Sequence, residues 1–244
     1  MRSDEFIKKI LKIAQDDEKF EELRKGTPLG VDVIEDIVLS QKYTGALAFR
    51  HTCVAGVKRT SFIRRLLITL SCLYEKEEAC FLIISPKTEY GELLRLRNMD
   101  ATVPYILTKE DLDNAKNTLV ELLQMRKTLK ACPKLFVVLD GLETLPNCNK
   151  DGGLEEYREI FELVTRQENI ELITSVDIVK TIFSGYPGAF VGIGNCLVAT
   201  QEEGLADVTY VNSDASLSQP LPIKFPDSPS ITETIVFLNS LPKE

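Results

Sequence analysis

The stretch that decides the fold is "HTCVAGVKRTSFIRRLL", residues 51–67. A short apolar run reaches Gly56, basic and hydroxyl-bearing residues follow, and apolar residues then recur at helical spacing. This order predicts a buried strand, a short turn and a helix. The turn brings Lys58, Arg59 and Thr60 to the start of the helix, where free backbone N–H groups and the helix dipole favour anions. The structural alternative is a plain strand-to-helix turn with Thr60 as the N-cap.

The composition is that of a globular protein with an acidic surface. With 29 basic and 37 acidic residues, the net charge is −8. This balance argues against a broad nucleic-acid-binding surface but is compatible with a local basic patch. No apolar run approaches the ~20 residues that span a bilayer, and residues 1–20 lack the apolar core of a signal peptide.

Cysteine and histidine usage limits the metal and redox chemistry. The six cysteines include no CxxC pair, so we expect reduced thiols, no metal cluster and a cytoplasmic location. The single histidine, His51, excludes multi-histidine metal chemistry and argues against a Ser-His-Asp triad. Its position inside a predicted strand indicates a structural role.

Strand-like and helix-like segments alternate along the middle of the chain. Thr108 and Asp111 form a predicted capping box at the start of one helix. Apolar strands without alternation, separated by helices, indicate a mainly parallel sheet with helices on both faces. Strands are predicted at residues 46–56, 80–85, 103–107, 134–140 and 170–176, and helices at residues 60–75, 89–97, 109–129, 154–168 and 177–183.

The two ends of the chain carry further predicted elements. Residues 4–25 read as an amphipathic helix, so we expect an N-terminal appendage at 1–26 and one α/β domain at 27–244. The domain begins with a predicted β-hairpin at a sheet edge, residues 28–40. Later segments are two strands (189–200 and 207–211), a Ser/Pro-rich connector (212–230) and a closing helix (231–241).

Six short motifs follow one another in order: "PLGVDVIEDIVLS", "HTCVAGVKRTSFIRRLL", "FLIISPKTEYGEL", "LVELLQMR", "LFVVLDGLETL" and "ELITSVD". Over residues 28–177 this order resembles the FtsK/SpoIIIE family of DNA-translocase motor domains. It is also similar to the degenerate terminal ATPase domains of type VII secretion proteins. The resemblance implies a P-loop NTPase (RecA/FtsK-like) fold, with ATP and Mg²⁺ as ligands at the carboxyl ends of the strands.

The resemblance also implies that some of the family's catalytic groups are replaced, with Phe62 matched to the phenylalanine that follows the family's GKS. Arg59 and Thr60 take the places of the family's lysine and serine, after a loop that is shorter and lacks inner glycines. Asp140 matches the Mg²⁺-ordering aspartate, but Gly141 replaces the catalytic glutamate, for which Glu143 is the substitute candidate. Loop and base are thus altered together, which favours a domain released from hydrolysis.

Two further positions depart from the family pattern. Ser85 replaces the aspartate before "PK", and Lys87 is expected to be solvated after Pro86. On the last strand of the motif series, Thr174 or Ser175 offers a hydroxyl where the family has a glutamine. Separately, Arg64 and Arg65 follow each other in the helix predicted at residues 60–75, and both are expected on a solvated face.

These matches define the candidate site. Asp140 and Thr60 are the candidate metal ligands, and Glu143 is the only candidate for a catalytic role. The candidate phosphate and magnesium site consists of Gly56, Lys58, Arg59, Thr60, Ser61 and Asp140.

The sequence supports three functional interpretations. The first is a degenerate, hydrolysis-deficient ATPase-fold domain with a structural, regulatory or nucleotide-binding role, whose partners are other ATPase subunits or domains, including a ring oligomer. The second is an active ATP-dependent DNA or protein translocase motor with an atypical phosphate loop. The third is a nucleotide- or peptide-binding module of another α/β family, because a shared fold does not give function. The joint departures at loop, base and sensor strand favour the first.

Overall fold

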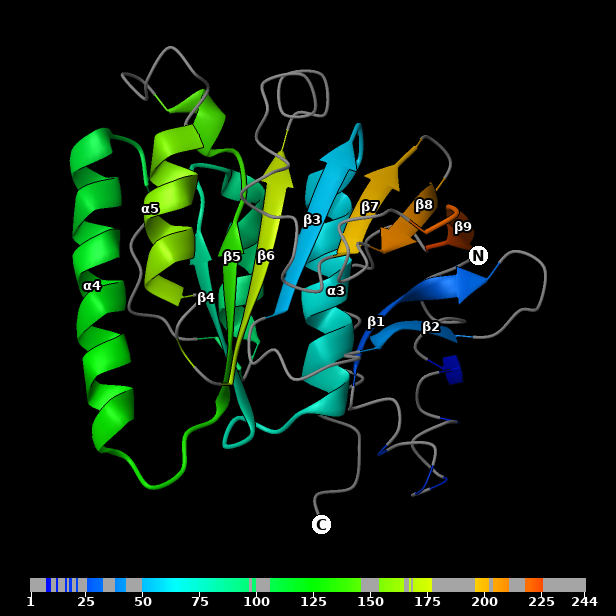
Figure 1. The fold of residues 1–244 in the computed structure, drawn as a ribbon, viewed down its shortest axis with the longest axis horizontal. Coiled ribbons are helices and arrows are strands. Elements are labelled where there is room, and N and C mark those ends of the chain that lie inside the picture. Colours follow the sequence, from blue (N-terminus) through cyan, green and yellow to red (C-terminus); the bar gives the residue numbers. More distant parts are fainter. Residues whose placement is uncertain are drawn as a thin grey trace.

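A computed structural model shows a nine-stranded sheet flanked by helices (Figure 1). It describes residues 8–9, 12, 16, 18, 21, 26–32, 38–42, 50–96, 98–99, 106–145, 154–164, 167, 169–176, 196–201, 204–210 and 218–225. The strands are β1 (Gly26–Asp32), β2 (Val38–Lys42), β3 (Arg50–Gly56), β4 (Ala79–Ile84), β5 (Lys134–Leu139), β6 (Ile170–Val176), β7 (Cys196–Thr200), β8 (Leu205–Tyr210) and β9 (Leu221–Lys224). The helices are α3 (Arg59–Leu73), η1 (Thr88–Arg95), α4 (Lys109–Thr128), η2 (Leu142–Thr144) and α5 (Leu154–Val164).

The sheet has a parallel and an antiparallel part. Its strand order is β2-β1-β9-β8-β7-β3-β6-β5-β4. The strands from β7 to β4 pair in parallel, whereas β8, β9, β1 and β2 extend the sheet with antiparallel pairs. In Figure 1 the arrowheads of β3, β6 and β7 point to the same edge. Ligands of parallel α/β sheets bind at this edge.

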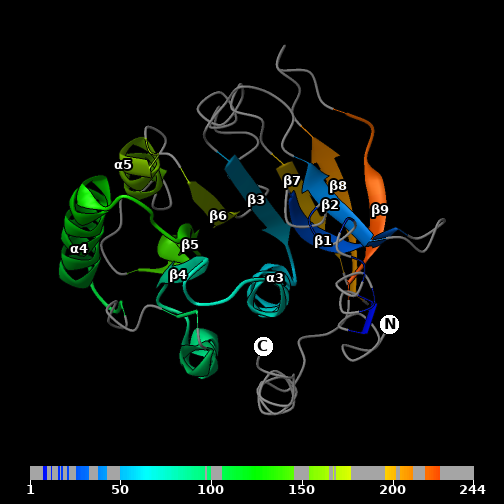
Figure 2. The same cartoon turned by 90° about the horizontal axis from the view of Figure 1, so that it is seen from below.

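Helices cover both faces of the parallel part, as Figure 2 shows. Residues of α3 and η1 pack with one set of strand side chains, including Phe81 and Phe136. Residues of α4 and α5 pack with the alternate set, including Leu82 and Val137. Since successive residues of a strand point to opposite faces, the apolar run of β5 supplies both cores.

The structure confirms most elements of the parallel part. The helix predicted at 60–75 is α3, the capping box of α4 is formed by Thr108 and Asp111, and the predicted hairpin is the β1–β2 pair at the sheet edge. The short helix predicted at 89–97 is the 3₁₀ helix η1.

One predicted element was wrong. The Ser/Pro-rich segment predicted as a connector contains strand β9, which pairs with both β8 and β1. Several predictions lie wholly or mostly outside the described residues: the helices at 4–25, 177–183 and 231–241, the strand at 103–107, and the first half of the strand at 189–200.

Candidate functional site

The turn after β3 is the first component of the site. β3 ends at Gly56 and α3 begins at Arg59, so only Val57 and Lys58 join the two elements. Gly56 has a φ of 99°, and a Cβ atom there would lie 2.0 Å from the backbone oxygen of Thr200. Glycine is therefore required at position 56, where β3 passes close to the end of β7.

The N-terminus of α3 differs from the expected capping arrangement. Lys58 is the N-cap residue and makes no side-chain cap. Thr60 lies inside the first turn, so the alternative interpretation with Thr60 as the N-cap was wrong. Lys58, Arg59 and Ser61 are partly exposed in the same turn, next to the exposed side chain of Val57.

Asp140 is the centre of the site. Its side chain is completely buried directly after β5. One carboxylate oxygen, Oδ2, accepts hydrogen bonds from the hydroxyls of Thr60 at 2.8 Å and Tyr90 at 2.7 Å. The other, Oδ1, accepts from Lys87 Nζ at 2.9 Å and from the hydroxyl of Ser175. A carboxylate has about four lone-pair sites, so these four donors satisfy it.

Lys87 reaches this carboxylate from the segment after β4. The prediction that it is solvated was wrong, since only 19% of its side chain is exposed and its ammonium forms an ion pair with Asp140. The same ammonium donates to the hydroxyl oxygen of Thr60 at 2.6 Å. Ser85 holds the start of this segment, because its hydroxyl donates to the backbone oxygen of Asp140 at 2.6 Å and accepts from the backbone N–H of Lys87.

Gly141 lies at the position that would carry the catalytic glutamate in the resembling family. Its φ is 78°, and a Cβ atom there would lie 2.7 Å from Cε of Lys87. The stem of Lys87 therefore passes directly over a residue that has no side chain. Glu143, the substitute candidate, belongs to η2, and its side chain lies outside the described part of the structure.

Thr174 and Ser175 are consecutive residues of β6, so their side chains point to opposite faces of the sheet. Ser175 faces Asp140, whereas Thr174 hydrogen bonds to His51 Nε2 at 2.8 Å on β3. His51 is buried and packs edge-on against Phe161 of α5. The structural role predicted for His51 is consistent with this environment, and Ser175 is the hydroxyl that belongs to the site.

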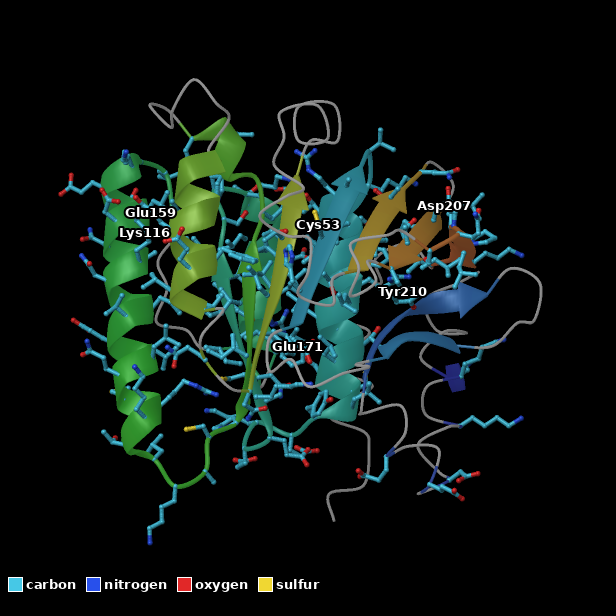
Figure 3. The ribbon with its side chains drawn as sticks, viewed as in Figure 1. Cys53, Lys116, Glu159, Glu171, Asp207 and Tyr210 are labelled. Carbon is cyan, nitrogen blue, oxygen red and sulfur yellow. The ribbon has the colours of Figure 1, made fainter. Side chains whose placement is uncertain are left out.

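Cys53 lies beside Thr174 in the middle of β3 and is labelled in Figure 3. Burial raises the pKa of its thiol to about 11, although a hydrogen bond with Thr174 acts in the opposite direction. At neutral pH the group is a thiol, and a thiol is a poor nucleophile. Cys53 forms no disulfide in this structure.

Neither Arg64 nor Arg65 lies on a solvated face. Only 17% of the Arg64 side chain is exposed, and it pairs with Glu92 of η1 at 2.8 Å. Arg65 is buried, with its guanidinium 4.7 Å from the ring centroid of Phe62 and 4.6 Å from that of Phe225. The prediction was therefore wrong for both arginines, and burial lowers the pKa of Arg65.

The predicted site residues fall into two groups, one in contact with Asp140 and one at the turn after β3. The structure brings Thr60 and Asp140 into direct contact, while Lys58, Arg59 and Ser61 remain around the turn. Lys87 and Tyr90 also belong to the site, although the sequence did not predict either of them. Among the described residues, no group of three or more His, Cys, Asp or Glu side chains could hold a metal ion.

A mainly parallel sheet covered on both faces, with a hydroxyl from the first helix against a strand-end aspartate, is an α/β fold of the P-loop NTPase type. The cytoplasmic domain of the type VII secretion ATPase EccC of Thermomonospora curvata is similar, with a TM-score of 0.59 and 12% identity over 84% of this chain and 26% of that one. ATPases 2 and 3 of EssC from Geobacillus thermodenitrificans give a TM-score of 0.53 and 11% identity over 83% of this chain and 41% of that one. The KaiC-like protein PH0186 of Pyrococcus horikoshii OT3 gives a TM-score of 0.50 and 9% identity over 82% of this chain and 99% of that one.

These similarities confirm the predicted fold and the predicted resemblance to type VII secretion ATPase domains at the level of the fold. The chain covers less than half of the EccC and EssC structures. The sequence matches no protein-family model and no curated protein. In the described part of the chain, no helix combines the length and the hydropathy needed to cross a bilayer.

Proposed function

We propose that this chain is a hydrolysis-deficient ATPase-fold domain with a structural or regulatory role in a translocase assembly. The observation that carries the proposal is the two-residue turn between Gly56 and Arg59. A phosphate-binding loop curls so that several backbone N–H groups converge on one anion, and glycines permit this conformation. Val57 and Lys58 are too few for such a loop and include no glycine.

The position after Asp140 supports the same proposal. A catalytic glutamate would orient the attacking water in the resembling family, but Gly141 has no side chain and lies against the stem of Lys87. A longer side chain at 141 would collide with a lysine that is itself held by two hydrogen bonds. The site therefore lacks both the phosphate loop and a base at the family's position.

The proposed partners follow from the similar structures. A second EccC structure and the EssC structure are each described as ATPases 2 and 3 of the protein. We therefore propose that this domain (27–244, with an appendage at 1–26) assembles with other ATPase domains or subunits in the cytoplasm. The cargo of such an assembly is either DNA or a polypeptide.

Calorimetric titration with Mg-ATP, together with a phosphate-release assay, tests the proposal. We expect no saturable heat at millimolar Mg-ATP and no phosphate release above that of Asp140→Asn. The matched variants are Asp140→Asn, which preserves the shape of the side chain, and Arg59→Ala at the turn. Turnover by the wild type that either variant abolishes would contradict the proposal.

One observation favours the alternative of an active motor with an atypical phosphate loop. Thr60 Oγ1 lies 2.8 Å from Asp140 Oδ2, as expected of a P-loop hydroxyl and a Mg²⁺-ordering aspartate. An active motor on DNA would show turnover that rises with added DNA and with protein concentration. A flat response in the same phosphate assay excludes it.

A further inference from the structure

The ammonium group of Lys87 lies between the two side chains that would share a magnesium ion in an active P-loop NTPase. Nζ is 2.6 Å from Thr60 Oγ1 and 2.9 Å from Asp140 Oδ1. In that class the P-loop hydroxyl and the strand-end aspartate both ligate Mg²⁺, which bridges the nucleotide phosphates. A positive charge is therefore present at this place, but the chain itself supplies it.

The residues present do not fit Mg²⁺. A metal ligand must offer a free lone pair, and all four lone-pair sites of the Asp140 carboxylate accept hydrogen bonds from side chains. Thr60 directs its hydroxyl hydrogen at Asp140 and accepts from Lys87 on the other side. A magnesium ion would have to displace the Lys87 ammonium and to turn the hydroxyl donors away.

Electrostatics explains why a cation is needed here at all. Asp140 is completely buried, and an ionised carboxylate without a counter-charge is strongly destabilising in the interior. Three neutral hydroxyls donate to it, yet only Lys87 balances the charge among the side chains that hydrogen bond to this carboxylate. The lysine stem reaches the site because Gly141 leaves room for it.

We infer that Lys87 is the built-in substitute for the divalent cation of this site. The ammonium holds Thr60 on α3 to Asp140 after β5, and Ser175 on β6 and Tyr90 on η1 complete the cluster. These side chains connect α3, η1, β6 and the end of β5 in the free domain. The inference deepens the proposed function, on which it rests, because it makes the folded site independent of nucleotide and metal.

Thermal unfolding in the absence of nucleotide tests the inference. We expect millimolar Mg²⁺ to leave the Tm of the wild type unchanged. Lys87→Ala leaves Asp140 without its counter-charge, so its Tm falls by roughly 6–20 °C. A small cation should then occupy the vacated space, and either Mg²⁺ or ethylammonium restores a large part of the lost Tm.

Lys116 provides a matched control, because 17% of its side chain is exposed and it pairs with two carboxylates, Asp113 and Glu159. Figure 3 shows Lys116 of α4 beside Glu159 of α5. The two carboxylates are each 49% exposed, so water can solvate them when the lysine is removed. Lys116→Ala should lose little stability and should not respond to either cation.

A second pair of variants covers the case in which Lys87→Ala does not fold. Lys87→Met preserves most of the stem that packs on Gly141 and removes the ammonium, with its charge and its two hydrogen bonds. Asp140→Asn in the same chain removes the carboxylate charge, so the double variant should be more stable than Lys87→Met alone. A double variant that is no more stable than Lys87→Met overturns the inference.

The results separate this inference from the proposed function. Stabilisation of the nucleotide-free wild type by Mg²⁺, abolished in Asp140→Asn, overturns the inference and leaves the ATPase question to the phosphate assay. A Lys87→Ala protein as stable as the wild type, or one that neither cation stabilises, also overturns it. ATP turnover by the wild type contradicts the proposed function instead.

Discussion

Gly141 and Lys87 depend on each other at the level of single residues. The left-handed backbone of Gly141, with a φ of 78°, suits glycine and strains any residue that has a Cβ atom. Such an atom would also lie 2.7 Å from Cε and 3.3 Å from Cδ of Lys87. Any side chain at position 141 would therefore have to displace the Lys87 stem.

Gly141→Ala should lower the free energy of unfolding by about 1–2 kcal/mol, the cost of a left-handed conformation for an L-residue. The displaced Lys87 stem adds to this loss. Urea unfolding measures the effect, with Gly91→Ala as the control, because a Cβ atom at Gly91 meets nothing within 4 Å. Equal stability of the two variants would show that the Lys87 stem does not constrain position 141.

Motif order alone was sufficient to place Thr60 and Asp140 together. The first residue follows β3 and the second follows β5, and both strands end at the same edge of a parallel sheet. Lys87 and Tyr90 could not be predicted in this way. Lys87 directly precedes the 3₁₀ helix η1, and Tyr90 lies within it. In such a segment neither strand nor α-helix periodicity fixes the direction of a side chain.

At the level of elements, α4 is the helix whose start is best determined by local chemistry. The backbone N–H of Asp111 donates to the Thr108 hydroxyl at 3.1 Å, and the Asp111 carboxylate accepts from the backbone N–H of Thr108 at 2.9 Å. The same carboxylate accepts from the backbone N–H of Leu107 at 3.0 Å. These bonds are local in sequence, which explains why "TKED" predicted this boundary correctly.

The capping box should give α4 a measurable pH dependence. Hydrogen bonds from the Leu107 N–H and from Thr108 lower the pKa of Asp111 below its ordinary value of 3.8. A lowered pKa means that the stabilisation is present above pH 3.8 and is lost as the pH falls through the folded value. In urea unfolding across this acid range, Asp111→Asn should flatten the loss of stability.

Thr108→Ala serves as the companion variant because it removes the cap but leaves the carboxylate. It should lower the free energy of unfolding by about 1 kcal/mol at neutral pH. An unchanged acid limb in Asp111→Asn would show that other carboxylates dominate the acid unfolding.

Strand β9 is an element that the sequence pattern did not predict. Its sequence, "LPIK", contains a proline within a Ser/Pro-rich segment, and proline in a strand normally argues against a central position. Pro222 pairs with Asp207 of β8, whereas the β1 pairing involves only Ile223 and Lys224. The proline thus lies beyond the end of the β1 ladder, so only tertiary pairing identifies the strand.

At the level of the whole molecule, one apolar core joins the parallel and antiparallel parts of the sheet. Ile223 of β9 and Phe225 belong to the same buried cluster as Phe62 of α3 and Phe136 of β5. The rings of Phe62 and Phe225 meet edge-on, with centroids 5.1 Å apart. The helix that carries Thr60 therefore packs against the antiparallel extension as well as against the parallel strands.

This shared core predicts that β9 contributes to the stability of the whole domain. Ile223 is completely buried, so Ile223→Ala should lower the free energy of unfolding by about 2–5 kcal/mol. Leu221 on the same strand is 37% exposed, and Leu221→Ala is expected to have a much smaller effect. Tyrosine fluorescence and far-UV circular dichroism during urea unfolding should give one coincident transition, shifted for Ile223→Ala, because both sheet parts share a core. Two separate transitions, with only the first shifted by Ile223→Ala, would mean that the antiparallel extension unfolds independently of the site.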